Sequence, residues 1–190
     1  MHKLDKQLDN PIDNMFRVMC EQTVHLFRYF MMTPNFITTL SLISGGLSAY
    51  MYSANKLVPA ILLFVTAYYL DCMDGYYARK YDMCTVFGEL YDHGSDILKH
   101  ALLLYAMYKK SHKKFFKVLP LLLFFTLASF VHLGCQEKHY EQQANTSEDQ
   151  QILISSTKML CPDHDYIKYT RFFGCGTLIL VFVASMIYLN

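Results

Sequence analysis

Hydrophobic residues gather in five stretches of the chain that have the length of membrane-spanning helices. A helix needs about 20 residues to cross the roughly 30 Å hydrocarbon core of a bilayer. The segments between these stretches are short and polar, except for a long polar segment at residues 135–166 that predicts a loop. The pattern predicts an all-α, polytopic membrane helix bundle with about five transmembrane helices. These predicted spans cover residues 36–52, 57–79, 86–108, 115–134 and 172–189.

Residues 11–30 show a different pattern, in which apolar side chains recur every three or four positions. Pro11 suits the first turn of a helix, and Arg17, Glu21 and Arg28 lie among the remaining positions. The pattern predicts an amphipathic helix that lies in the headgroup layer, and a helix packed on the bundle is the alternative. We therefore expect a single domain over 1–190, with an interfacial helix in 1–33 and the bundle in 34–190.

Composition excludes some classes of function. The 190 residues are 53% hydrophobic and carry a formal net charge of +1. No strong basic excess favours nucleic acid as a partner. The six cysteines form no C-x-x-C pair and have no regular spacing, so the sequence predicts neither a disulfide framework nor a zinc site.

Four aspartates lie where the second predicted span ends and the third begins. Asp71 and Asp74 are three residues apart, and Asp92 and Asp96 are four apart, so each pair projects from one face of its own helix. The two spans run in opposite directions, which places both pairs at the same side of the membrane. We expect the four carboxylates to converge in one cleft.

Carboxylates at the border of a membrane span are tolerated when they pair, face a wet cavity or bind ions. Four like charges repel unless cations bridge them. Mg²⁺ or Mn²⁺, as a pair, fits a site made of oxygen ligands, and a metal pair suits displacement at phosphorus. The alternative is that these residues are helix-end charges that face water.

The segment from Asp71 to Asp96 reads D-x2-DG-x2-AR-x8-G-x3-D-x3-D. It resembles the signature of the CDP-alcohol phosphotransferase family at all eight fixed positions. The resemblance implies an integral membrane transferase of phospholipid synthesis. Such an enzyme breaks the pyrophosphate of a CDP-alcohol, releases CMP and joins the remaining phosphoryl group to a second alcohol. One of the two alcohols is then a lipid, and the resemblance also implies a homodimer.

The resemblance also assigns roles to residues. Asp96 is the candidate general base, and His93 is its rival, because a histidine follows the third aspartate in the choline and ethanolamine branch. Arg79 can grip a phosphate, and the small residues leave room for the cytidine. Lys99, on the Asp96 face, is a candidate for choosing the acceptor, with interfacial anchoring as the alternative. The expected metal ligands are Asp71, Asp74, Asp92 and Asp96, and the expected CDP-binding residues are Asn35, Gly75, Ala78, Arg79, Thr85 and Gly88.

Asn35 enters through the segment PNFIT, which is similar to the family's Pro-Asn-x-x-Thr. The string GELYDHGSD resembles the choline and ethanolamine phosphotransferase branch, which is the leading prediction. The length of the chain is closer to branches that join CDP-diacylglycerol to inositol, glycerol phosphate or serine. The family usually has six spans and this pattern gives five, which motivates a non-catalytic membrane partner as a second class. A divalent-metal transporter is a third, although it gives the glycines and Arg79 no purpose.

The membrane is expected to be the endoplasmic reticulum or an equivalent inner membrane, with the active site facing the cytosol, where CDP-alcohols are made. The basic segment 109–117 then lies on the opposite side, against the positive-inside tendency. Asn145-Thr146-Ser147 is a glycosylation acceptor pattern that stays unmodified in this orientation, and a glycan there would reverse it.

Overall fold

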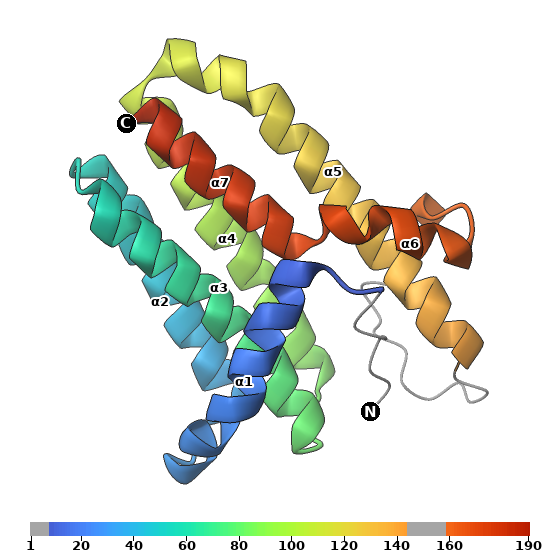
Figure 1. The fold of residues 1–190 in the computed structure, drawn as a ribbon. Helices are drawn as coiled ribbons and strands as arrows, with labels where there is room; N and C mark the ends of the chain where they lie inside the picture. The colour runs from blue at the N-terminus through green and yellow to red at the C-terminus, as the bar shows by residue number, and fades with distance from the viewer. Residues whose placement is uncertain (1–7, 144–158) are drawn as a thin grey trace. The chain divides into compact units, whose positions relative to one another are not determined.

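The structure is a computed structural model that describes residues 8–143 and 159–190, without the side chains of residues 140–143 and 164. Every regular element in these ranges is a helix, which confirms the all-α prediction (Figure 1). The acceptor pattern at Asn145 lies outside the described residues. The helices are α1 (Pro11–Tyr29), α2 (Pro34–Ser53), α3 (Leu57–Lys80), α4 (Val86–Lys110), α5 (His112–Gln143), α6 (Ile167–Thr170) and α7 (Cys175–Leu189), with 3-10 turns η2 (His164–Tyr166) and η3 (Arg171–Phe173).

Each predicted span falls on a helical stretch, but the described stretches differ in how apolar they are. Three of them are long and apolar enough to cross a membrane: Leu57–Lys80, His112–His139 and Ile167–Leu189. Helix α2 carries a row of hydroxyl side chains, and α4 carries the charged residues of the motif. For α2 and α4 the crossing therefore stays a prediction from length and position.

The predicted loop at 135–166 is wrong for its first part, because α5 continues to Gln143. The residues that follow Cys135 are hydrophilic, yet most are glutamine, glutamate or lysine, which favour a helix. The loss of hydrophobicity thus marks where the chain becomes polar and not where the helix ends. The 3-10 turn η2 also lies within the predicted loop, whereas α6 begins directly after its predicted end.

Two compact units are distinguished by their internal contacts. The first comprises Met1–Met15, of which the structure describes residues 8–15, and the described part of Pro120–Val181. The second comprises Phe16–Leu119 and Phe182–Asn190. Helices α2, α3 and α4 lie wholly within the second unit, and so does the whole Asp71–Asp96 motif.

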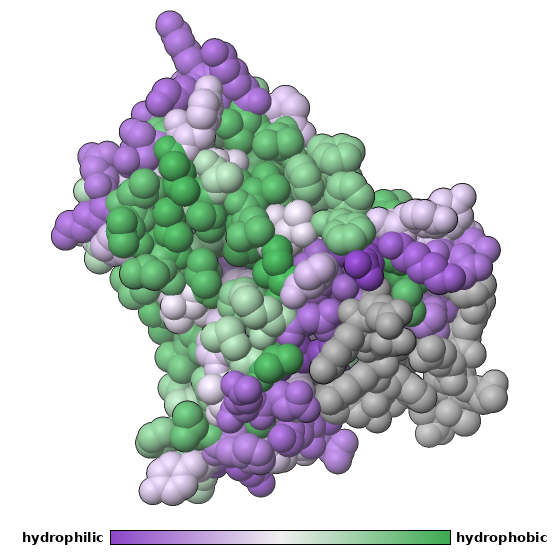
Figure 2. Space-filling model, in the orientation of Figure 1, coloured by the Kyte–Doolittle hydropathy of each residue, from purple (hydrophilic) through white to green (hydrophobic). Residues whose placement is uncertain are grey.

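Helix α2 packs against both α3 and α4. Its contacts use small and hydroxyl side chains, which allow close approach between membrane helices. The Ser41 hydroxyl donates to the Ala67 carbonyl at 2.8 Å, and the Ser48 hydroxyl donates to the Ala60 carbonyl at 2.7 Å. A Cβ added at Gly45 would lie 2.7 Å from Cβ of Lys99, so α2 and α4 approach closely there. On the face seen in Figure 2, hydrophobic residues cover the first half of α3.

Helix starts and turns in the second unit follow local sequence signals. Thr33 caps α2 by accepting from the Phe36 amide, with Pro34 as the first helical residue. Thr85 caps α4 by accepting from the Gly88 amide at 3.0 Å. Asp82, in the turn between α3 and α4, has φ 54°, a left-handed conformation that aspartate tolerates.

The part of α1 in the second unit packs against α3. Cys20 and Val24 are buried in a core that includes Met73, Tyr76 and Tyr77. Burial raises the pKa of the Cys20 thiol to about 12. The packing interpretation of this helix is therefore correct. Its other face exposes apolar side chains, among them Met19 and Leu26, as an interfacial helix does, so the interfacial prediction stays open.

The first unit contains a disulfide that the cysteine spacing does not predict. Cys135 of α5 is bonded to Cys161, with their Cα atoms 5.1 Å apart. The spacing gives no signal because the two residues are 26 positions apart and belong to different elements. In the same unit, Asn10 caps α1 and donates through Nδ2 to the Arg171 carbonyl and to Thr177 Oγ1, both at 2.8 Å.

Replacing Gly45 with alanine should lower the free energy of unfolding by about 1–3 kcal/mol, because the new methyl group collides with the stem of Lys99. Gly46→Ala is the matched control, since a Cβ there meets nothing within 4 Å. Helix propensity alone favours alanine by up to about 1 kcal/mol at both sites. Thermal or denaturant unfolding in detergent measures both variants. Equal stability of the two variants would contradict the close approach.

Candidate active site

Three carboxylates meet between α3 and α4. Asp71 of α3 and Asp92 and Asp96 of α4 each place one carboxylate oxygen within 4.8 Å of the other two. The turn at residues 81–85 reverses the chain, so the end of α3 lies level with the start of α4. The i, i+4 spacing on α4 then aims Asp92 and Asp96 at the same place. We call these three residues the carboxylate cluster.

Asp74, the fourth predicted ligand, faces α2. Its side chain is buried, and its Oδ2 accepts a hydrogen bond from the Thr38 hydroxyl at 2.6 Å. Its carboxylate remains close enough to those of Asp92 and Asp71 to be repelled by their negative charges. The structure thus brings three of the four aspartates together and holds the fourth beside them. Thr38 is the threonine of the PNFIT segment, and no pattern in the sequence connects it with Asp74.

Lys99 lies inside the carboxylate cluster. Its Nζ is 2.6 Å from Asp71 Oδ1 and 2.6 Å from Asp96 Oδ1. It also donates to Ser41 Oγ at 3.0 Å. The sequence places Lys99 on the correct face of α4 but does not reveal that its ammonium turns inward, and it gives Ser41 no role.

A signal for the contribution of α2 is present in the sequence. Thr38, Ser41, Gly45 and Ser48 recur every three or four residues, so they share one face of α2. All four are buried. A stripe of small and hydroxyl side chains in a membrane helix is typical of a helix interface. The stripe marks the face of α2 that packs on α3 and α4.

Three predicted CDP-binding residues converge at the start of α4. A Cβ added at Gly88 would lie 2.9 Å from Thr85 Oγ1 and 3.1 Å from Asn35 Oδ1. Only glycine therefore fits between these two side chains without displacing one of them. The residues come from α2 and α4, separated by about fifty positions in the chain, and their meeting supports treating them as one site.

The other three predicted CDP-binding residues lie at the end of α3. A Cβ added at Gly75 would be 3.1 Å from Nη1 of Arg79, so the guanidinium folds over the glycine one turn earlier. Arg79 itself is exposed and Ala78 is partly buried. The guanidinium thus has access to solvent beside a patch of bare backbone.

The two candidate bases differ in their surroundings. The Asp96 side chain is 40% exposed and lies in the carboxylate cluster. His93 Nδ1 lies 2.8 Å from the Glu89 carbonyl one turn earlier. A carbonyl only accepts hydrogen bonds, so Nδ1 carries the proton and neutral His93 has Nε2 as its free acceptor. Both residues retain an atom that can take a proton.

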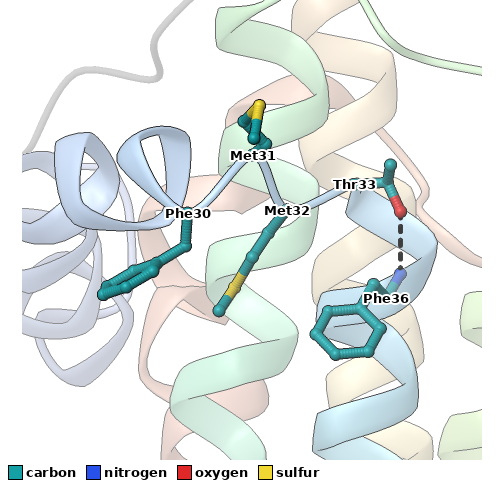
Figure 3. Close-up of a pocket in the computed structure, with 5 residues that line it drawn as sticks. All are labelled: Phe30, Met31, Met32, Thr33 and Phe36. Atoms are coloured by element: carbon teal, nitrogen blue, oxygen red, sulfur yellow. Dashed lines mark hydrogen bonds between the residues drawn. The ribbon is translucent and has the colours of Figure 1, made fainter.

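A cavity lies elsewhere in the second unit, at the turn between α1 and α2 (Figure 3). Its volume is about 510 Å³, and it is lined by Phe30, Met31, Met32, Thr33 and Phe36. Figure 3 shows the Thr33 side chain turned to the Phe36 amide that it caps. None of these lining residues is ionisable, and none belongs to the carboxylate cluster.

Comparisons of the sequence with known proteins found one curated relative and one family. A curated relative from Schizosaccharomyces pombe, a cardiolipin synthase (CMP-forming) / mitochondrial hydrolase fusion protein, is 37% identical over 59 residues. The match covers 31% of this chain and 10% of that protein, so the chain spans about a tenth of the relative's length. No solved structure matches the chain significantly. The sequence profile of the CDP-alcohol phosphatidyltransferase family matches residues 31–188, which is most of the chain and includes the carboxylate cluster, and the chain belongs to this family.

Proposed function

We propose that the protein is a divalent-metal-dependent membrane enzyme that transfers a substituted phosphate from a CDP-alcohol to a second alcohol and releases CMP. The observation that carries the proposal is the carboxylate cluster, formed between two helices of a chain that belongs to the CDP-alcohol phosphatidyltransferase family. The printed name of the curated relative, which includes "CMP-forming", supports CMP as a product.

The carboxylate cluster fits a hard divalent cation. Its oxygens converge from three side chains, and Asp92 Oδ1 is buried without a hydrogen-bond partner among the described residues. Carboxylate oxygens are the ligands that Mg²⁺ and Mn²⁺ prefer. Such an ion supplies charge stabilisation for phosphate oxygens and for the leaving group. Asp71, Asp92 and Asp96 would hold it, with Asp74 beside them. The sequence predicts two ions, and the position of the Lys99 ammonium affects how many the site can bind.

Asp96 is the proposed general base. The acceptor hydroxyl gives its proton to the Asp96 carboxylate as its oxygen bonds to phosphorus, and the phosphoanhydride bond breaks so that CMP leaves. Asp96 is suited to this step because its side chain is partly exposed at the edge of the cluster. His93 is the second candidate and would accept the proton at Nε2.

The CDP group is proposed to bind along the start of α4 and the end of α3. Gly75, Ala78 and Gly88 leave the backbone open to the cytidine, and Asn35 and Thr85 flank Gly88 with hydrogen-bonding oxygens. Arg79 offers a planar set of donors to a phosphate. This arrangement would hold the pyrophosphate near the carboxylate cluster.

Two substrate branches remain as proposals. The histidine after Asp92 favours the choline and ethanolamine branch, in which a CDP-aminoalcohol reacts with a lipid alcohol. The length of the chain favours the branches that use CDP-diacylglycerol as donor and inositol, glycerol phosphate or serine as acceptor. The curated relative is named as a cardiolipin synthase (CMP-forming). A non-catalytic partner would bind a CDP-alcohol without forming CMP. The homodimer stays a prediction from family resemblance.

The site is proposed to face the cytosol, in the endoplasmic reticulum or an equivalent membrane. Helix α4 has 25 residues, which at 1.5 Å each is enough to cross the hydrocarbon core. The turn at residues 81–85 and the turn at Ser111 then lie on opposite sides of the membrane. Cys84, in the first of these turns, is free and exposed.

A substrate panel tests the reaction. Purified protein with Mn²⁺ should form CMP from CDP-choline, CDP-ethanolamine or CDP-diacylglycerol in the presence of a suitable acceptor, and mass spectrometry identifies the lipid product. Asp96→Asn should lower kcat by about 10²–10⁴-fold, the usual contribution of a general base. His93→Gln should lower it by less than tenfold. A greater loss in His93→Gln would assign the base to His93, and binding without CMP in the wild type would favour the non-catalytic partner.

Metal binding is tested by Asp92→Asn, which should weaken Mn²⁺ affinity at least about tenfold, because even changes in outer-shell partners cost 10–100-fold. The control is Asp82→Asn, an exposed residue at φ 54°, where asparagine fits the backbone. Isothermal titration with the protein in detergent measures both. Equal Mn²⁺ affinity in the two variants would remove the cluster from the metal site.

Labelling of Cys84 tests the orientation. In sealed vesicles with the cytosolic face outward, a membrane-impermeant maleimide should label the protein without detergent, and Cys84→Ser should remove that label. The buried Cys20 should not react, because its raised pKa keeps the thiol protonated. Lys113→Cys in the Cys84→Ser background, an exposed position just after Ser111, should react only after permeabilisation. The reverse pattern would place the site on the other side.

A further inference from the structure

Among the lysines that the structure describes, Lys99 is the buried one, with a side chain only 4% exposed. A lysine ammonium has three hydrogens and no acceptor, and burying it without partners is costly. Here an oxygen lies near Nζ for each hydrogen: Asp71 Oδ1, Asp96 Oδ1 and Ser41 Oγ, at 2.6, 2.6 and 3.0 Å. The ammonium therefore sits where a cation shared by Asp71 and Asp96 would sit.

The position of this ammonium is fixed from two directions. The Ser41 hydroxyl donates its own proton to the Ala67 carbonyl at 2.8 Å, which leaves its oxygen lone pairs for Lys99. The aliphatic stem of Lys99 crosses Gly45, where an added Cβ would lie 2.7 Å from Cβ and 3.4 Å from Cγ and Cδ. Helix α2 thus holds both ends of the side chain, and the ammonium does not swing freely out of the cluster.

The charge balance of the carboxylate cluster also favours a single divalent ion. Its three carboxylates, when ionised, carry three negative charges, and the Lys99 ammonium offsets one of them. A single divalent ion neutralises the remaining charge of these three carboxylates, whereas two ions would leave an excess of positive charge even when the neighbouring Asp74 is counted. Among the described residues, Lys99 forms ion pairs with Asp71 and Asp96 but not with Asp92, whose buried Oδ1 has no hydrogen-bond partner. Asp96 Oδ1 also lacks a hydrogen bond, but the Lys99 ammonium lies 2.6 Å from it.

We propose that the Lys99 ammonium takes the place of one of the two divalent ions predicted from the sequence, so that the active site binds a single metal ion on its Asp92 side. This inference rests on the proposed metal-dependent function. The ammonium would orient Asp71 and Asp96 in the absence of metal, and it would leave one coordination site to be filled from solution.

Counting bound Mn²⁺ tests the inference without reference to activity. Electron paramagnetic resonance or isothermal titration of the purified wild type in detergent should give one Mn²⁺ per chain. Lys99→Met, which keeps an unbranched side chain one atom shorter and removes its charge, should give two. Lys109→Met, a change of the same kind near the end of α4, should give one. Without metal, Lys99→Met should melt at a lower temperature than the wild type, and Mn²⁺ should raise its melting temperature by more than it raises that of the wild type.

The outcomes separate this inference from the proposed function. Two Mn²⁺ per wild-type chain would overturn the role of Lys99 and leave the metal-dependent function standing, even if Lys99→Met did not fold. One Mn²⁺ in both the wild type and folded Lys99→Met would also overturn it. Wild-type Mn²⁺ binding no stronger than that of Asp92→Asn would overturn both proposals at once.

Discussion

The mutual repulsion of carboxylates within a membrane helix bundle is the constraint on which the rest of this structure depends. Asp71, Asp92 and Asp96 approach one another closely where little water is available to screen their charges. Such a group is stable only when cations and hydrogen-bond donors surround it. Lys99 supplies a cation and Thr38 supplies a donor to the neighbouring Asp74. The same repulsion supports the proposal that the group binds a divalent ion.

Helix α2 stabilises the site because its buried face carries hydroxyl and small side chains in place of large apolar ones. Its buried face carries Thr38, Ser41, Gly45 and Ser48. Thr38 donates to the Asp74 carboxylate, the two serines donate to α3 carbonyls, Ser41 also accepts from the Lys99 ammonium, and Gly45 allows α4 to approach. A helix with such a face is less apolar than a lipid-exposed span, which explains why α2 does not qualify as a membrane span by composition. The scaffold of the site and the weak hydropathy of this helix thus have one cause.

Sequence periodicity predicts the helices and the two aspartate pairs, because a helix fixes which residues share a face. It does not predict which neighbour a side chain meets across helices. Asp74 points to Thr38, and Lys99 turns inward rather than to solvent or substrate; both depend on packing between helices distant in the sequence. The end of α5 is predicted too early from the polar residues after Cys135, because hydrophilic residues can continue a helix. The Cys135–Cys161 disulfide likewise depends on a distant pairing.

The charged groups of the site differ in how deeply they are buried, and this difference indicates that they have different roles. Lys99 is almost completely buried, Asp71 is 21% exposed and Asp96 is 40% exposed. A substrate arriving from outside therefore meets Asp96 before Asp71, and it cannot reach the Lys99 ammonium directly. A permanent cation is best placed at the closed end, where no exchange with solvent is needed. The proposed proton acceptor needs access to the substrate, and Asp96 is the most exposed of these three groups.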